Sequence, residues 1–133
     1  MFMKQNKRGD WHFQELSTDP KDARLDFMNS GLCPLTLGHD GPKIGNVIRD
    51  SSYVNNGAGY ADIRFANDPF AEKVLRLVIS GRTKAVSIGA KAVDWIDVPS
   101  ESGGLPKVFF TTWEPYEISI VAKGSDCGAR ILI

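Results

Sequence analysis

Three polar residues, far apart in the sequence, have the side chains that a serine hydrolase needs. Ser87 lies in the strand-like run Ala-Val-Ser-Ile-Gly of residues 85–89, His39 precedes a turn, and Glu117 lies in the run Tyr-Glu-Ile-Ser-Ile-Val of residues 116–121. A serine hydroxyl keeps its proton at neutral pH, so it needs a neighbouring base and a third group that orients this base. Imidazole suits the middle role because its pKa is about 6.5. The three residue types therefore predict acyl transfer through a serine, a histidine and an acid.

The residues around Ser87 are unusually small on one face of the predicted strand. Strand side chains alternate between faces, so Ala85, Ser87 and Gly89 share a side while Val86 and Ile88 face the other way. Little bulk is then expected over the serine hydroxyl, and a peptide or an oxyanion can approach it closely.

Two histidines compete for the role of the base. His12 lies between two aromatic residues in a weakly patterned amino-terminal region, whereas His39 follows an apolar run and precedes a turn rich in glycine. Turns on a rigid scaffold often present functional side chains. This position favours His39, with His12 as the alternative.

Three carboxylates are candidates for orienting the histidine. Glu117 alternates with apolar neighbours and shares a face with Ser119, so it either faces solvent on a half-exposed strand or is buried to hold a partner. Asp40 and Asp94 are rivals, although Asp40 is adjacent to His39 and adjacent side chains on an extended chain point apart. The residues alone leave this choice open.

Composition restricts the class of protein. The 133 residues fit one domain, and sixteen basic against sixteen acidic side chains give no net charge, which disfavours a nucleic-acid partner or an anionic membrane. No apolar run is long enough to span a bilayer, and no export signal is recognisable, so a cytosolic protein is expected. Cys33 and Cys127 are predicted to be free thiols, and the sequence has no close pair of metal ligands.

The pattern of elements indicates a mainly β (α+β) fold. One amphipathic helix is predicted at residues 68–80, where Asp68 can cap the first turn and Pro69 fits the first helical position. The apolar stripe of this helix consists of Phe70, Val74, Leu77 and Val78. The strand candidates are residues 11–16, 32–37, 44–54, 60–66, 84–98, 107–113 and 116–122.

The predicted strands are joined mostly by hairpins, which favours an antiparallel β-barrel of about six or seven strands. The candidates 44–54 and 60–66 are predicted to form one hairpin, and Glu114-Pro115 is expected to separate the last two strands. Residues 1–24 form a polar amino-terminal segment, and 25–133 a single domain.

Three sequence blocks carry a resemblance to a known family. They are His39-Asp40 followed by Ile44-Gly45, the helix that ends at Gly81 and leads into Val86-Ser87-Ile88-Gly89, and the block from Trp113 to Val121. In this order and separation, residues 25–133 resemble the tailed-phage prohead proteases, the capsid-maturation serine proteases whose fold is similar to that of herpesvirus assemblins.

The resemblance implies a serine endopeptidase in which Ser87 is the nucleophile, His39 the general base and Glu117 the acid. Its substrates would be the phage scaffold and the removable segment of the major capsid protein, cut inside the assembling prohead in the host cytoplasm, without a metal or an organic cofactor. The assemblin likeness also suggests a homodimer. Residues 123–128 lack the proline that the family usually has there. The alternatives are a catalytically idle barrel that binds scaffold or capsid, and a hydrolase of small esters.

Overall fold

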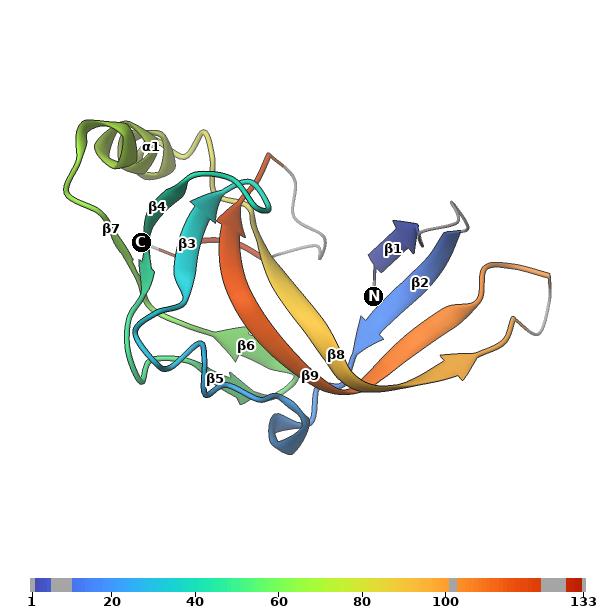
Figure 1. Ribbon diagram of the computed structural model, residues 1–133. Helices are drawn as coiled ribbons and strands as arrows, with labels where there is room; N and C mark the ends of the chain where they lie inside the picture. Colours follow the sequence, from blue (N-terminus) through green and yellow to red (C-terminus); the bar gives the residue numbers. More distant parts are fainter. Residues whose placement is uncertain (1, 6–10, 101–102, 123–128, 133) are drawn as a thin grey trace.

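The computed structural model describes residues 2–5, 11–100, 103–122 and 129–132, which form a mainly β fold with one α-helix and a mixed sheet (Figure 1). The elements are β1 (Phe2–Gln5), β2 (Trp11–Leu16), the 3-10 helix η1 (Pro20–Asp22), β3 (Pro34–Leu37), β4 (Lys43–Val47), β5 (Tyr53–Asn55), β6 (Ala58–Tyr60), β7 (Ile63–Phe65), α1 (Pro69–Ile79), β8 (Val86–Val98) and β9 (Lys107–Ile120).

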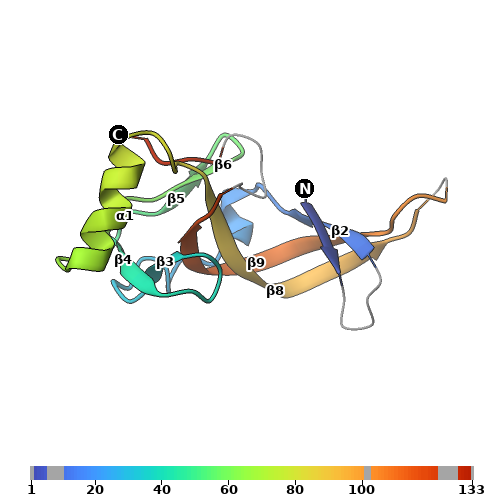
Figure 2. The ribbon, with the colours of Figure 1, turned by 90° about the horizontal axis from the view of Figure 1, so that it is seen from above.

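Strand β9 is the centre of the sheet. Its whole length pairs with β8 in an antiparallel ribbon, and its other edge is shared by two strands that both run parallel to it. Strand β2 pairs with the first half of β9 and β3 with its last three residues, so the sheet continues to β1 on one side and to β4 and β7 on the other. Seen from above, the β8–β9 ribbon extends from the end that carries α1 to the opposite end of the molecule (Figure 2).

The prediction of an antiparallel barrel is therefore only partly right. The described strands form a seven-stranded mixed sheet and a separate two-stranded sheet, and among them the outermost strands β1 and β7 do not pair to close a barrel. The parallel pairs join segments that are distant in the sequence, and such pairs have no local signal comparable to a hairpin turn.

Two further strand predictions need correction. The segment 44–66 is a hairpin, but it divides into an outer pair, β4 with β7, and an inner pair, β5 with β6, in which Tyr53 stacks on Tyr60 with ring centroids 5.0 Å apart. Glu114 and Pro115 do not end a strand, because β9 continues through them. The ladder shifts register between Gly89 and Ala90, so Tyr116 is an extra residue at a β-bulge. A bulge is one of the few places where a sheet accepts a proline.

Helix α1 begins and ends close to its predicted bounds. The Asp68 side chain accepts a hydrogen bond from the Ala71 amide at 2.8 Å, Pro69 takes the first helical position, and Ser80 forms the carboxyl-terminal cap. Gly81 follows with a φ of +81°, a conformation that favours glycine. These local capping signals set where the helix begins and ends.

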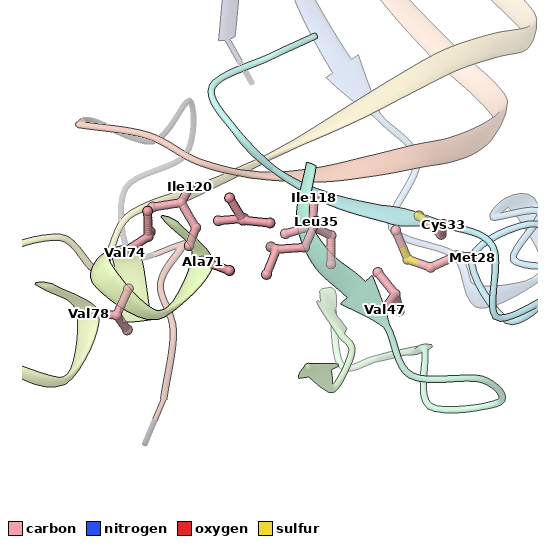
Figure 3. Close-up of a cluster of buried hydrophobic side chains, with 10 residues drawn as sticks. Met28, Cys33, Leu35, Val47, Ala71, Val74, Val78, Ile118 and Ile120 are labelled. Atoms are coloured by element: carbon pink, nitrogen blue, oxygen red, sulfur yellow. The ribbon is translucent and has the colours of Figure 1, made fainter. Parts of the chain in front are cut away.

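The core lies between α1 and one face of the sheet. Figure 3 shows the side chains of Leu35 and Ile118 from the strands directed toward those of Ala71 and Val74 from the helix. The buried line of the helix is Ala71, Val74 and Val78, whereas Phe70 is 47% exposed and Leu77 38% exposed. The predicted stripe is therefore wrong for these two residues, which flank the buried line.

The amino-terminal region contributes to the sheet as well. The predicted strand at residues 11–16 is confirmed as β2, which pairs with β9 from Phe13 to Leu16. The indole of Trp113 donates a hydrogen bond to the Ser17 carbonyl oxygen at 2.9 Å. These contacts tie the described part of residues 1–24 to the central strand.

Cys33 is a free, fully buried thiol in this core, while Cys127 lies outside the described residues. Burial raises the pKa of Cys33 from 9.0 to about 11, and the nearby Glu117 carboxylate adds to the rise. Because the thiolate is the reactive form, we expect Cys33 in the folded protein to resist iodoacetamide at pH 8 and to react once urea unfolds the chain. The raised pKa keeps the buried thiol neutral at moderate pH. Above a pH of about 9 the unfolded chain loses this proton more easily than the folded protein, so the free energy of unfolding should fall as the pH rises from there toward 11. Peptide mapping by mass spectrometry would separate the alkylation of Cys33 from that of Cys127. Equal rates of Cys33 alkylation in the folded and the unfolded protein would contradict the expected protection.

Candidate active site

The site begins as a row of three hydroxyl side chains across three neighbouring strands. In register, Thr36 of β3 lies beside Ser119 of β9, which lies beside Ser87 of β8. Their neighbours along each strand, among them Leu35 and Ile118, face the core. Because strand side chains alternate, the hydroxyl row lies on the face of the sheet opposite α1.

His39 reaches this face from the turn between β3 and β4. The turn is closed by a hydrogen bond from the Gly41 amide to the Gly38 carbonyl oxygen at 3.0 Å, and Gly38 and Asp40 both have positive φ values, +78° and +54°. A Cβ on Gly41 would lie 1.9 Å from the Leu37 carbonyl oxygen, so only glycine fits there. The glycine-rich sequence thus turns the chain tightly enough to present His39 near the end of β3.

The three residues predicted from the sequence lie together in one hydrogen-bonded chain. His39 Nε2 is 3.0 Å from Ser87 Oγ, and His39 Nδ1 is 2.6 Å from Glu117 Oε1. Both distances are within the reach that an activated nucleophile and its oriented base require. The arrangement has the order hydroxyl, imidazole, carboxylate that characterises the serine hydrolase triad.

The partners of the imidazole determine which of its nitrogens carries the proton. An ionised carboxylate only accepts hydrogen bonds, so Nδ1 must be the protonated nitrogen in the contact with Glu117. Nε2 of the neutral ring is then the acceptor, and the Ser87 hydroxyl donates to it. In this tautomer His39 is ready to remove the serine proton.

The β-bulge in β9 brings Glu117 close to the backbone of β8. Gly89 is its cross-strand partner, and a Cβ built on Gly89 would lie 2.7 Å from Glu117 Cγ and 2.7 Å from Tyr116 Cε2. These distances are shorter than real Cβ contacts. The absence of a side chain at position 89 therefore makes room for both the carboxylate stem and the tyrosine ring.

Tyr116 borders the site as a partly exposed ring. Burial raises the pKa of Tyr116, and the carboxylates of Glu117 and Asp40 raise it further. The phenol is thus kept neutral beside two negative charges, and it can act as a hydrogen-bond donor near the triad.

The surroundings of these three residues differ from the sequence expectation at Ser87 and decide between the two alternatives for Glu117. Ser87 is only 6% exposed, and the space beside Gly89 is not open, because Tyr116 and Glu117 lie against that glycine. Glu117 is 4% exposed, so it is the buried, partnered acid rather than a solvent-facing residue. The His39 side chain is 39% exposed, and the site reaches the surface at the imidazole.

The other candidates for the base and for the orienting acid lie elsewhere or make different contacts. Among the described contacts, Asp40 meets Glu117 only through its backbone amide, 3.5 Å from Oε2. Asp94 lies in the distal half of β8, where it pairs with Thr112. His12 pairs with Lys4 in the β1–β2 ladder, and its side chain lies outside the described part of the structure.

Sequence reasoning missed two members of the site, Thr36 and Ser119. Ser119 Oγ is 3.2 Å from Glu117 Oε1, and Thr36 Oγ1 is 2.9 Å from Ser119 Oγ. A signal for Ser119 is its position two residues after Glu117 on the same strand face. Thr36 is the one polar side chain in the apolar run 34–37, which hints at a buried hydrogen-bond partner.

Neither a metal centre nor a membrane span accompanies the site in the part of the chain described. Residues 2–5, 11–100, 103–122 and 129–132 include no cluster of three or more histidine, cysteine or acidic side chains that could hold a metal ion. No helix within those ranges is long and apolar enough to cross a membrane. Comparison of the chain with protein-family models, with curated proteins and with solved structures finds no match.

Proposed function

We propose that this protein is a serine endopeptidase that works by acyl transfer through Ser87, His39 and Glu117. The observation that carries the proposal is the continuous chain of contacts from the Ser87 hydroxyl to His39 at 3.0 Å and on to the Glu117 carboxylate at 2.6 Å. Each residue taken alone is more often structural than catalytic. Their convergence from three distant segments at catalytic distances, in the tautomer that the reaction needs, favours a catalytic role.

The geometry suggests the following reaction. His39 Nε2 takes the Ser87 proton while Oγ attacks the peptide carbonyl carbon, which forms a tetrahedral oxyanion. The same imidazole then protonates the leaving amine, and the acyl-serine ester remains. Water, deprotonated by His39, attacks this ester and releases the acid, and the proton returns to Ser87. Glu117 holds the ring in one tautomer and stabilises the imidazolium, while backbone amides, with Gly89 and Ala90 as candidates, would stabilise the oxyanion.

The choice of substrate rests on the sequence resemblance to the phage prohead proteases. On this basis we propose that the enzyme cleaves scaffold and capsid-protein segments inside the assembling prohead, as a homodimer with an assemblin-like arrangement of its sheet. The mostly β architecture with one helix is compatible with that relationship.

A serine-directed fluorophosphonate tests the enzymatic part of the proposal. Incubation of the purified protein should add the mass of one phosphonyl group at Ser87, because the oriented imidazole makes this hydroxyl nucleophilic. Peptide mapping by mass spectrometry locates the adduct. Ser80 is the matched control, since it is an exposed serine whose hydroxyl donates to the Leu77 carbonyl oxygen, and it should stay unmodified.

The substrate is tested separately with purified scaffold and capsid chains. Cleavage that depends on Ser87 would support the endopeptidase, whereas turnover of short esters without cleavage of either chain would point to a small-ester hydrolase. A folded protein in which Ser87 remains unlabelled would overturn the proposal and favour a catalytically idle β module that binds scaffold or capsid.

A further inference from the structure

We propose that Thr36 and Ser119 are positioning residues, whose hydroxyl groups form a chain that holds the Glu117 carboxylate in place behind His39. This inference rests on the proposed function of the triad and extends it to two residues that support its acid. We infer that they act on Ser87 through Glu117 and the imidazole.

The contacts around the Glu117 carboxylate are closely spaced. Oε1 lies 2.6 Å from His39 Nδ1 and 3.2 Å from Ser119 Oγ, and Ser119 Oγ is itself 3.2 Å from Nδ1. Thr36 Oγ1 is 2.9 Å from Ser119 Oγ and 3.5 Å from Glu117 Oε2. One carboxylate oxygen therefore meets two donors, the imidazole and the Ser119 hydroxyl, and a second hydroxyl, that of Thr36, lies behind Ser119.

Counting protons gives the direction of this chain. Each hydroxyl has one hydrogen to donate, and the ionised carboxylate can only accept. If Ser119 donates to Glu117 Oε1 at 3.2 Å, Thr36 is free to donate to Ser119 at 2.9 Å; the reverse order would need the longer contact of 3.5 Å from Thr36 to Oε2. In the arrangement with the shorter contacts, Thr36 donates to Ser119 and Ser119 donates to Glu117 Oε1. The same carboxylate oxygen accepts the hydrogen bond from His39 Nδ1.

Burial makes these hydrogen bonds effective. Ser119 is 0% exposed, and Thr36 and Glu117 are nearly as buried. Away from bulk water, a hydrogen bond to a charged group is stronger than on the surface, and hydroxyls in a chain polarise one another.

The register of the sheet fixes both hydroxyls relative to the acid. Thr36 pairs with Ser119 across β3 and β9, and Ser119 is two residues from Glu117 on the same strand. Rotation of the carboxylate away from Nδ1 would break the bond from Ser119, so the chain opposes it. The result is a carboxylate oriented before substrate arrives, as preorganised catalysis requires.

The test compares Ser119→Ala, the isosteric change Thr36→Val and the hydroxyl-keeping control Thr36→Ser, all measured as the rate of Ser87 labelling by the fluorophosphonate. Loss of a hydrogen bond to a charged group should slow labelling ~30-fold in Ser119→Ala, and loss of a neutral bond ~5-fold in Thr36→Val. Thr36→Ser keeps the hydroxyl and should stay within ~2-fold of the original rate. Because Thr36 acts through Ser119, adding Thr36→Val to Ser119→Ala should slow labelling by less than a further ~2-fold.

A second measurement separates positioning from mere stability. The ¹⁵N chemical shifts of the His39 ring report which nitrogen carries the proton. Ser119→Ala should move these shifts away from those of the pure Nδ1–H form. The melting temperature should show that the variant is still folded under the conditions of the measurement. Unchanged labelling rates and ring shifts in folded Ser119→Ala, alongside normal labelling of the original protein, would overturn this inference and leave the proposed function intact. If the original protein is not labelled at all, the proposed function itself fails.

Discussion

Changing His39 to alanine should lower the rate of Ser87 labelling, and of any peptide cleavage, by at least ~10²-fold, the usual contribution of a positioned general base. His39 Nε2 is the described acceptor of the Ser87 proton at 3.0 Å, and without it the hydroxyl keeps this proton at neutral pH. The fold should survive, because the His39 side chain is 39% exposed and belongs to a turn that glycines and backbone hydrogen bonds maintain.

The matched control is His12→Ala, since His12 is the second of the two histidines in the chain. This variant should label at the original rate. The measurement is the time course of adduct formation by intact-protein mass spectrometry, with circular dichroism as the check of folding. Undiminished labelling in folded His39→Ala would show that another group activates Ser87 and would remove the basis of the triad.

Strand alternation was sufficient to place the side chains of the site on their faces. It correctly put Ser87 opposite Val86 and Ile88, and it put Glu117 on the same face as Ser119. Alternation has a period of two, which a local stretch of sequence displays directly. The helix bounds were equally accessible, because the cap at Asp68 and the glycine at position 81 are local signals.

The partners across the sheet could not be predicted in the same way. Thr36 meets Ser119 because β3 runs parallel to β9, and nothing near either residue specifies a pairing with a segment so distant along the chain. The burial of Glu117 has the same origin, since an isolated alternating strand does not reveal what covers its polar face. The sequence therefore identified the three residues that lie together in the proposed triad, while the residues that support them depend on long-range register.

The β-bulge explains why Pro115 misled the sequence interpretation. Proline lacks the amide hydrogen that a ladder needs, so it was expected to end a strand, yet β9 accommodates it where the register shifts. The extra residue at this shift, Tyr116, precedes Glu117 directly, and both lie against Gly89. The bulge that makes this strand hard to recognise in the sequence therefore also sets the position of Glu117.

This close approach predicts that Gly89→Ala will slow Ser87 labelling by at least ~10²-fold, part of the ~10⁴-fold loss seen when the acid of a serine protease triad no longer holds the correct tautomer. The added Cβ would lie 2.7 Å from Glu117 Cγ and 2.7 to 2.8 Å from two ring atoms of Tyr116. Something must move, and an overpacked site of this kind costs about 1–3 kcal/mol of stability. Displacement of Glu117 would lengthen its 2.6 Å contact with His39 Nδ1.

Gly59→Ala is the matched control, because a Cβ at that position of β6 meets nothing within 4 Å and the backbone there does not require glycine. It should label at the original rate. The double variant Gly89→Ala with Tyr116→Ala distinguishes the two neighbours: the ring can be removed, but Glu117 Cγ remains as close, so labelling should stay slow. Recovery of the labelling rate in the double variant would mean that the added methyl group displaces Tyr116 rather than Glu117. A normal labelling rate in Gly89→Ala alone would mean that the contact between Glu117 and His39 does not depend on a glycine at position 89.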